Sequence, residues 1–177
     1  MKTFRMNKHL PWAPADIFRL LMDAESFPAA HPALKAARTV WVRPGYRDIE
    51  MDFHKASGAI LQGRALGLRV TSAPPHRIEA IRTKGQIEQL KMTVGLNPDG
   101  GGGTDMDFAL AYQTGQGDAA DNMAFPLVKK IVGETLSRFE ACAAACAASG
   151  AFSIEADESS GPDVTRRGRR KSGYQPS

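Results

Sequence analysis

The sequence predicts an α+β domain in which an antiparallel sheet of about seven strands is covered by one long C-terminal helix. Apolar and polar residues alternate with period two over much of residues 1–114, as in strands with one buried face. Turn signals such as Pro44-Gly45 and the stretch 97–103 (NPDGGGG) separate these segments. Residues 123–148 then change to the 3.6-residue period of an amphipathic helix.

The first strand is predicted from the alternation around Phe4 and Met6, and two short helices follow it. Pro14 suits the first turn of a helix, and apolar residues then recur at helical spacing. A second short helix is expected between Phe27 and Pro32. The remaining strands are predicted at 36–43, 46–54, 59–72, 76–83, 86–96 and 104–114, with Gly63 and Gly67 as possible bulges.

Residues 1–150 form the predicted domain, and residues 151–177 form a predicted disordered, charged tail. Apolar periodicity ends there, and Ser, Gly, Pro and charged residues take over, so this segment cannot bury enough surface to offset its ordering entropy. The basic run 166–171 (RRGRRK) could bind an anionic partner, although a solvated segment is the ordinary reading of such a run.

Composition excludes several classes of protein. The net charge of +4 is too small to indicate a specific nucleic-acid binder. We expect a cytoplasmic protein, because neither a secretory signal nor an apolar run of membrane-spanning length is visible. The two cysteines, Cys142 and Cys146, make no disulfide framework. No HExxH or CxxC spacing occurs, so we expect no metal site, and nothing indicates a cofactor.

Several stretches resemble one superfamily. The opening WAPADIFRLLMDAESFPAAHPALKAARTV (12–40) has a proline-led helix, an aromatic-Pro pair and a short helix. SAPPHRIEAIRTKG (72–85) is similar to a central strand entry, and NPDGGGGTDMDFALAY (97–112) to a Gly-rich turn before the last strand. With the closing helix 123–148, these segments resemble the START-like, or SRPBCC, superfamily, which includes polyketide cyclases and coenzyme Q-binding proteins.

The resemblance implies a helix-grip fold, with a curved sheet wrapped around the C-terminal helix and two short helices after the first strand. It also implies an apolar cavity between sheet and helix, and therefore binding or transport of a small hydrophobic molecule such as a lipid, quinone or polyketide. Fold alone does not choose between binding and catalysis. We expect a binding protein rather than an enzyme, because no acid/base pair stands out. A cyclase or dehydratase acting in the same cavity is one alternative, and a protein that binds the ribosome or another partner is a second.

The candidate ligand-binding residues are apolar side chains expected on the inner faces of the sheet and helix, together with a few polar groups. The apolar candidates are Met51, Phe53, Leu90, Met92, Phe108, Leu110, Val128, Val132 and Phe139, joined by Thr135. His31, Arg64 and Tyr112 are the candidate polar contacts to a ligand, with Arg82 less favoured than Arg64. The alternative is a filled core, a loop-capping histidine, arginines that extend to solvent and a core tyrosine. The sequence does not determine the oligomeric state.

Overall fold

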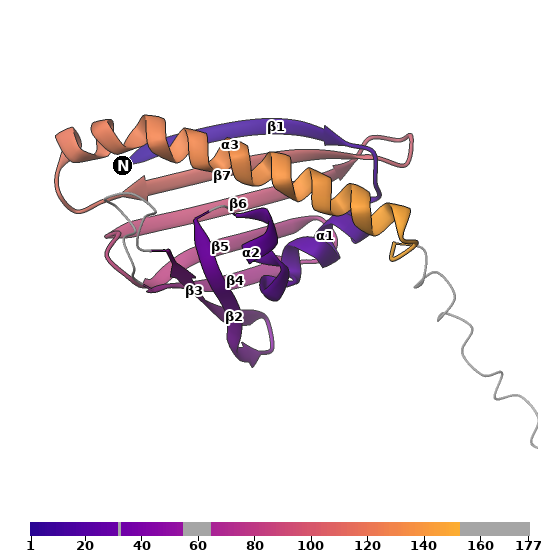
Figure 1. Ribbon diagram of the computed structural model, residues 1–177, viewed down its shortest axis with the longest axis horizontal. Helices are drawn as coiled ribbons and strands as arrows, with labels where there is room; N and C mark the ends of the chain where they lie inside the picture. The colour runs from indigo at the N-terminus through magenta and orange to yellow at the C-terminus, as the bar shows by residue number, and fades with distance from the viewer. Residues whose placement is uncertain (32, 55–64, 153–177) are drawn as a thin grey trace, which may run out of the picture.

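The computed structural model describes residues 1–31, 33–54 and 65–152. It contains one seven-stranded antiparallel sheet, a pair of short helices with a 3-10 turn between them, and one long helix (Figure 1). The elements are β1 (Lys2–Leu10), α1 (Pro14–Met22), η1 (Ala24–Ser26), α2 (Phe27–Ala30), β2 (Leu34–Arg43), β3 (Tyr46–Phe53), β4 (Ala65–Ala73), β5 (Arg77–Lys84), β6 (Gln89–Pro98), β7 (Thr104–Gln113) and α3 (Asp118–Ala148). The predicted helix-grip α+β architecture is confirmed.

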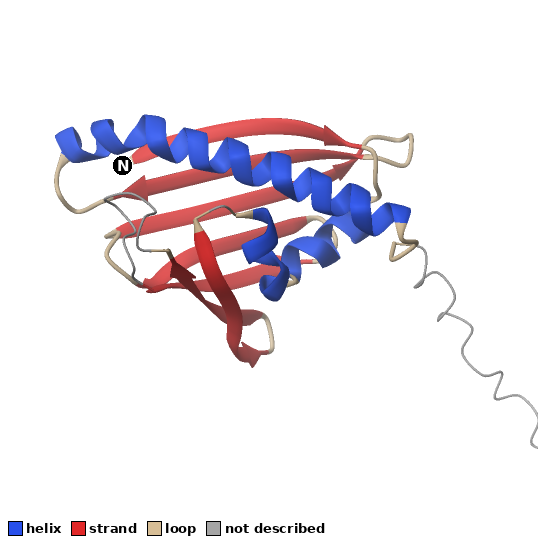
Figure 2. Ribbon diagram, in the orientation of Figure 1, coloured by secondary structure: helices blue, strands red, loops and turns tan. Residues whose placement is uncertain are grey.

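The strands lie in the order β1-β7-β6-β5-β4-β3-β2, so β2 to β7 form a meander and β1 returns to pair with β7. α3 runs across one face of this sheet, and α1 and α2 lie beside it on the same face (Figure 2). β2 and β3 are joined at Pro44-Gly45 as predicted, where Gly45 has a φ of +86°. β1 and β2 therefore form the two edges of the sheet.

Alternation along the strands decides which side chains meet the helices. β7 shows this most regularly, because Met106, Phe108, Leu110 and Tyr112 are buried, each at most 8% exposed. Their neighbours Asp105 and Asp107, like Asp52 on β3, are exposed on the other face. The period-two prediction for this strand is confirmed.

The predicted bulge at Gly67 is confirmed by a shift in the β4–β5 register between Gly67 and Leu68. A Cβ at this position would lie 2.8 Å from Thr83 Oγ1 and 2.9 Å from Lys84 Cβ, so the strands approach closely only because the residue is glycine. The predicted bulge at Gly63, the first residues of the 59–72 strand and the predicted tail beyond Phe152 lie outside the described residues.

The long helix begins at Asp118, five residues before the predicted start at position 123. A start at 123 would put Pro126 in the first turn, where proline is tolerated, whereas the structure places it inside the helix. The first turn is instead stabilised by acids. Asp121 is buried, and its Oδ1 accepts hydrogen bonds from the Thr114 backbone N–H (2.8 Å) and Oγ1 (2.6 Å). These bonds hold the pKa of Asp121 below its usual value and fix the start of α3 to the end of β7.

Candidate functional site

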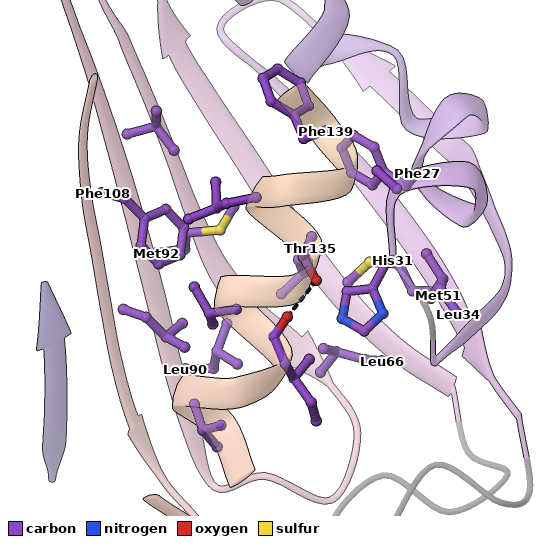
Figure 3. A pocket seen from close by; sticks show the side chains of 18 of the residues that line it. Phe27, His31, Leu34, Met51, Leu66, Leu90, Met92, Phe108, Thr135 and Phe139 are labelled. Atoms are coloured by element: carbon purple, nitrogen blue, oxygen red, sulfur yellow. Dashed lines mark hydrogen bonds between the residues drawn. The ribbon is translucent and has the colours of Figure 1, made fainter. Parts of the chain in front are cut away.

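A cavity of about 260 Å³ lies between the inner face of the sheet and α3, and the α2 segment lies at its side (Figure 3). Every candidate residue that the structure describes lines it, except the less favoured Arg82. These residues are His31, Met51, Phe53, Leu90, Met92, Phe108, Leu110, Tyr112, Val128, Val132, Thr135 and Phe139. Arg64 lies outside the described residues. The sheet and the long helix therefore enclose a hollow, not a filled core, at this position.

Sequence reasoning missed part of the lining. The additional residues are Leu21, Phe27, Ala30, Leu34, Leu66, Leu68, Ile87, Val94, Met106, Leu127, Ile131 and Leu136. Val94 shares a face with Leu90 and Met92, and Met106 shares one with Phe108, so the alternation signal for these two residues was present. Leu127 and Ile131 precede Val128 and Val132, which means that α3 presents two adjacent columns of side chains to the cavity. A helix face about 100° wide predicts such a second column.

His31 is the principal polar group of the cavity wall. It follows α2 directly, and its backbone N–H donates to the Phe27 carbonyl at 2.8 Å. The imidazole Nδ1 accepts a hydrogen bond from the Ala33 backbone N–H at 3.2 Å, and the ring lies edge-on to Phe53 at 5.8 Å. Because Nδ1 accepts, the proton of the neutral ring is assigned to Nε2. Nε2 has no hydrogen-bond partner among the described residues.

Burial keeps this ring neutral. Desolvation lowers the pKa of His31 below 6.5, and the positive charge of Arg138 lowers it further, while an interaction with the residue's own backbone opposes them. A neutral imidazole with a free Nε2–H is a hydrogen-bond donor, not a cation. His31 therefore offers one donor to a molecule in the cavity.

Thr135 supplies the complementary group. Its Oγ1 donates to the Ile131 carbonyl at 2.7 Å, so the hydroxyl proton is used within the helix and the oxygen lone pairs can still accept. In Figure 3 Thr135 on α3 and His31 beside α2 both extend into the space enclosed by the apolar side chains. The thioethers of Met51 and Met92 lie on the same lining and can adapt to the shape of an occupant.

Two polar candidates have structural partners. The Tyr112 hydroxyl donates to the Asp121 carbonyl at 3.0 Å, and burial raises its pKa, as does the nearby Asp121 carboxylate. Its proton is therefore not available to a ligand, in contrast to the sequence-based expectation. Arg82 does not line the cavity, because its guanidinium donates to the Gly85 (2.7 Å) and Glu88 (2.9 Å) carbonyls in the β5–β6 connection.

Within residues 1–31, 33–54 and 65–152, no group of three or more His, Cys, Asp or Glu side chains could hold a metal ion. In the same ranges, every helix is too short or too polar to cross a bilayer.

The lowered pKa of His31 predicts a loss of stability in mildly acidic solution. The unfolded chain takes up a proton on His31 near pH 6.5, whereas the folded chain does so only at lower pH. The free energy of unfolding therefore falls as the pH falls through this window. Urea denaturation should show that wild type loses more stability than His31→Gln between about pH 7.5 and about pH 5.5. Equal losses in the two proteins would contradict the assignment of a buried neutral imidazole.

No family model matches the chain, and no curated protein matches it. Solved structures do. The aromatase/cyclase Zhui from Streptomyces sp. R1128 superposes with a TM-score of 0.70 at 10% identity, covering 82% of this chain and 95% of its own. A STAR-related lipid transfer protein from Xanthomonas axonopodis superposes with a TM-score of 0.65 at 18% identity, covering 80% of this chain and 85% of its own. A START superfamily protein from Mycobacterium smegmatis superposes with a TM-score of 0.57 at 18% identity, covering 80% of this chain and 92% of its own. This chain therefore has the helix-grip fold of the START-like, or SRPBCC, superfamily.

Proposed function

We propose that this protein binds a small, largely apolar molecule in the cavity between the sheet and α3. The observation that carries the proposal is a hollow of about 260 Å³ whose lining is almost entirely aliphatic, aromatic and thioether side chains. Transfer of an apolar molecule from water into such a space gains about 25 cal/mol per Å² of surface buried, before the costs of association. Apolar contact supplies most of the affinity.

The cavity volume limits the size of the occupant. An apolar cavity of about 150 Å³ is known to hold benzene. A volume of about 260 Å³ therefore suits two fused rings or an aliphatic chain of similar bulk. We propose an occupant of that size.

The two polar groups define one end of the ligand. Nε2–H of His31 can donate to an oxygen, and Thr135 Oγ1 can accept from a hydroxyl. His31 is held neutral, which favours an uncharged oxygen over a carboxylate. The proposed ligand is thus a neutral hydrophobic molecule with one hydroxyl or carbonyl oxygen. The structural neighbours support this class, since one is described as a lipid transfer protein and another as an aromatase/cyclase.

Binding is favoured over the two alternatives. Proton-transfer chemistry would need a second titratable group facing the ligand. Among the described lining residues the other titratable group is Tyr112, and its hydroxyl donates to the Asp121 carbonyl. The convergence of His31 with Arg64, which would favour a cyclase, involves a residue outside the described ranges. A protein that acts only through its surface would have no use for a hollow interior, so the cavity also weighs against the ribosome- or partner-binding alternative.

Filling the cavity tests the proposal. Naphthol, which has two fused rings and one hydroxyl, serves as the probe ligand. Val132→Phe places a ring in the space between α3 and the sheet, and we expect it to weaken naphthol binding about tenfold or more, because the added ring and naphthol compete for the same volume. Titration calorimetry measures the dissociation constant, and thermal unfolding checks that the variant is folded.

The matched control is Ser137→Phe, which adds the same ring on the exposed side of the same helix. It should bind naphthol as wild type does. Unchanged binding by a folded Val132→Phe protein would rule out this cavity as the ligand site.

The role of His31 is tested with two ligands that differ by one oxygen. We expect His31→Leu to weaken naphthol binding about five- to tenfold, since a net hydrogen bond contributes about 1 to 1.5 kcal/mol. The affinity for naphthalene, which has no oxygen, should change by less than about twofold in the same variant. His31→Gln, whose amide can still donate, should keep most of the naphthol affinity. If both ligands weaken equally in His31→Leu, the residue contributes shape only and is not the polar anchor.

A further inference from the structure

The β2–β3 hairpin carries exposed apolar side chains that the cavity does not use. Residues 40–45 are all exposed, and among them Val40 is 43%, Trp41 51% and Val42 70% exposed. The hairpin lies at the free β2 edge of the sheet, and its tip extends away from α3 (Figure 1). Exposed aromatic and β-branched residues on an edge strand are a liability in water, so proteins that retain them commonly use them for contact.

The charge around these side chains is positive. β2 contains Lys35, Arg38 and Arg43 and no acidic residue. Two of the three acids of β3 are paired, because Asp48 binds Arg69 at 2.9 Å and Glu50 binds Arg38 at 2.9 Å. The third, Asp52, lies opposite Ala36, at the end of β3 away from the hairpin tip. Arg43 has no carboxylate partner among the described residues, and its guanidinium lies 4.9 Å from the centre of the Trp41 ring.

Strand register brings a second arginine–aromatic pair to the same face. Trp41 lies opposite Asp48 and Arg43 opposite Tyr46, and directly opposed residues share a face. Arg69, on the adjacent strand, lies 4.4 Å from the centre of the Tyr46 ring. The outer face of the hairpin thus presents Trp41, Arg43 and Tyr46 together, beside the ion pair that Asp48 forms with Arg69 of β4.

We propose that this outer face of the β2–β3 hairpin docks on an anionic membrane surface. Tryptophan and tyrosine rings favour the boundary between headgroups and acyl chains, and arginine binds lipid phosphate. Val40, which precedes Trp41 at a shift in the strand register and is 43% exposed, adds apolar area beside the ring. Val42 pairs with Arg47 and lies on the opposite face of the strand. A second copy of the chain fits less well, because pairing two β2 edges would bring together strands that carry only cations.

Docking would bring the protein to the lipid bilayer, in which neutral hydrophobic molecules dissolve. The surface and the cavity are nevertheless separate features, and the inference does not depend on the proposed ligand. Loss of vesicle binding and loss of naphthol binding are measured independently, so failure of one is distinguishable from failure of the other.

Vesicle cosedimentation of the full chain tests the proposal. Phosphatidylcholine vesicles containing about 30% phosphatidylglycerol should bind the protein more tightly than pure phosphatidylcholine vesicles, and added salt should weaken the binding. We expect Trp41→Ala to lower the partition coefficient about tenfold, through lost apolar burial. Arg43→Gln should lower it about fivefold, through one lost charge near the surface. Residues 151–177 are present in every variant, so any contribution they make is common to all.

Met123→Ala is the matched control, because Met123 is 83% exposed and lies on α3, not on the hairpin. It should leave partitioning within about twofold of wild type. Four results would overturn the proposal. Partitioning unaffected by Trp41→Ala and Arg43→Gln would place the contact elsewhere, as would a loss confined to Met123→Ala. A dimer in light scattering that Trp41→Ala dissociates, without vesicle binding, would make the face an interface between copies. Binding of an RNA oligonucleotide that requires Arg43, without vesicle binding, would make it a nucleic-acid surface.

Discussion

One helix has to cover the inner face of a seven-stranded sheet, and this mismatch in width governs the rest of the structure. Strands about 4.8 Å apart give a sheet roughly 29 Å wide, whereas a helix with its side chains is about 10 to 12 Å across. α3 therefore packs closely against part of the sheet, and α1 and α2 cover more of the same face (Figure 2). The space between these contacts is the cavity. The hydrogen bonds from Thr114 and Tyr112 to Asp121 hold α3 in place over it.

Most of the fold could be predicted from the sequence because its signals are local. Period-two alternation identified the strands, and the change to a 3.6-residue period identified the closing helix. The start of that helix could not be predicted in this way. It depends on Asp121 reaching back to Thr114, a contact between elements, and on Pro126 being tolerated inside the helix.

In the candidate site, the apolar lining could be predicted from the sequence, whereas the partners of the polar groups could not. Residues such as Met92, Leu110 and Val132 follow from knowing which face of an element is apolar, and the structure places them around the cavity. Whether a polar side chain faces the cavity or bonds to the protein depends on partners elsewhere in the chain or on loop geometry. Tyr112 is bound to the α3 backbone and Arg82 to the β5–β6 connection. Whether apolar faces enclose a hollow or fill it depends on the spacing between elements, which residue pattern alone does not specify.

Native mass spectrometry of the protein purified from its source cells, followed by organic extraction, tests the central claim most directly. The account predicts one neutral, mostly apolar molecule per chain, of a size that about 260 Å³ can hold, released by organic solvent. An empty protein whose thermal unfolding is unaffected by neutral bicyclic aromatics, quinones, sterols and fatty acids would contradict it.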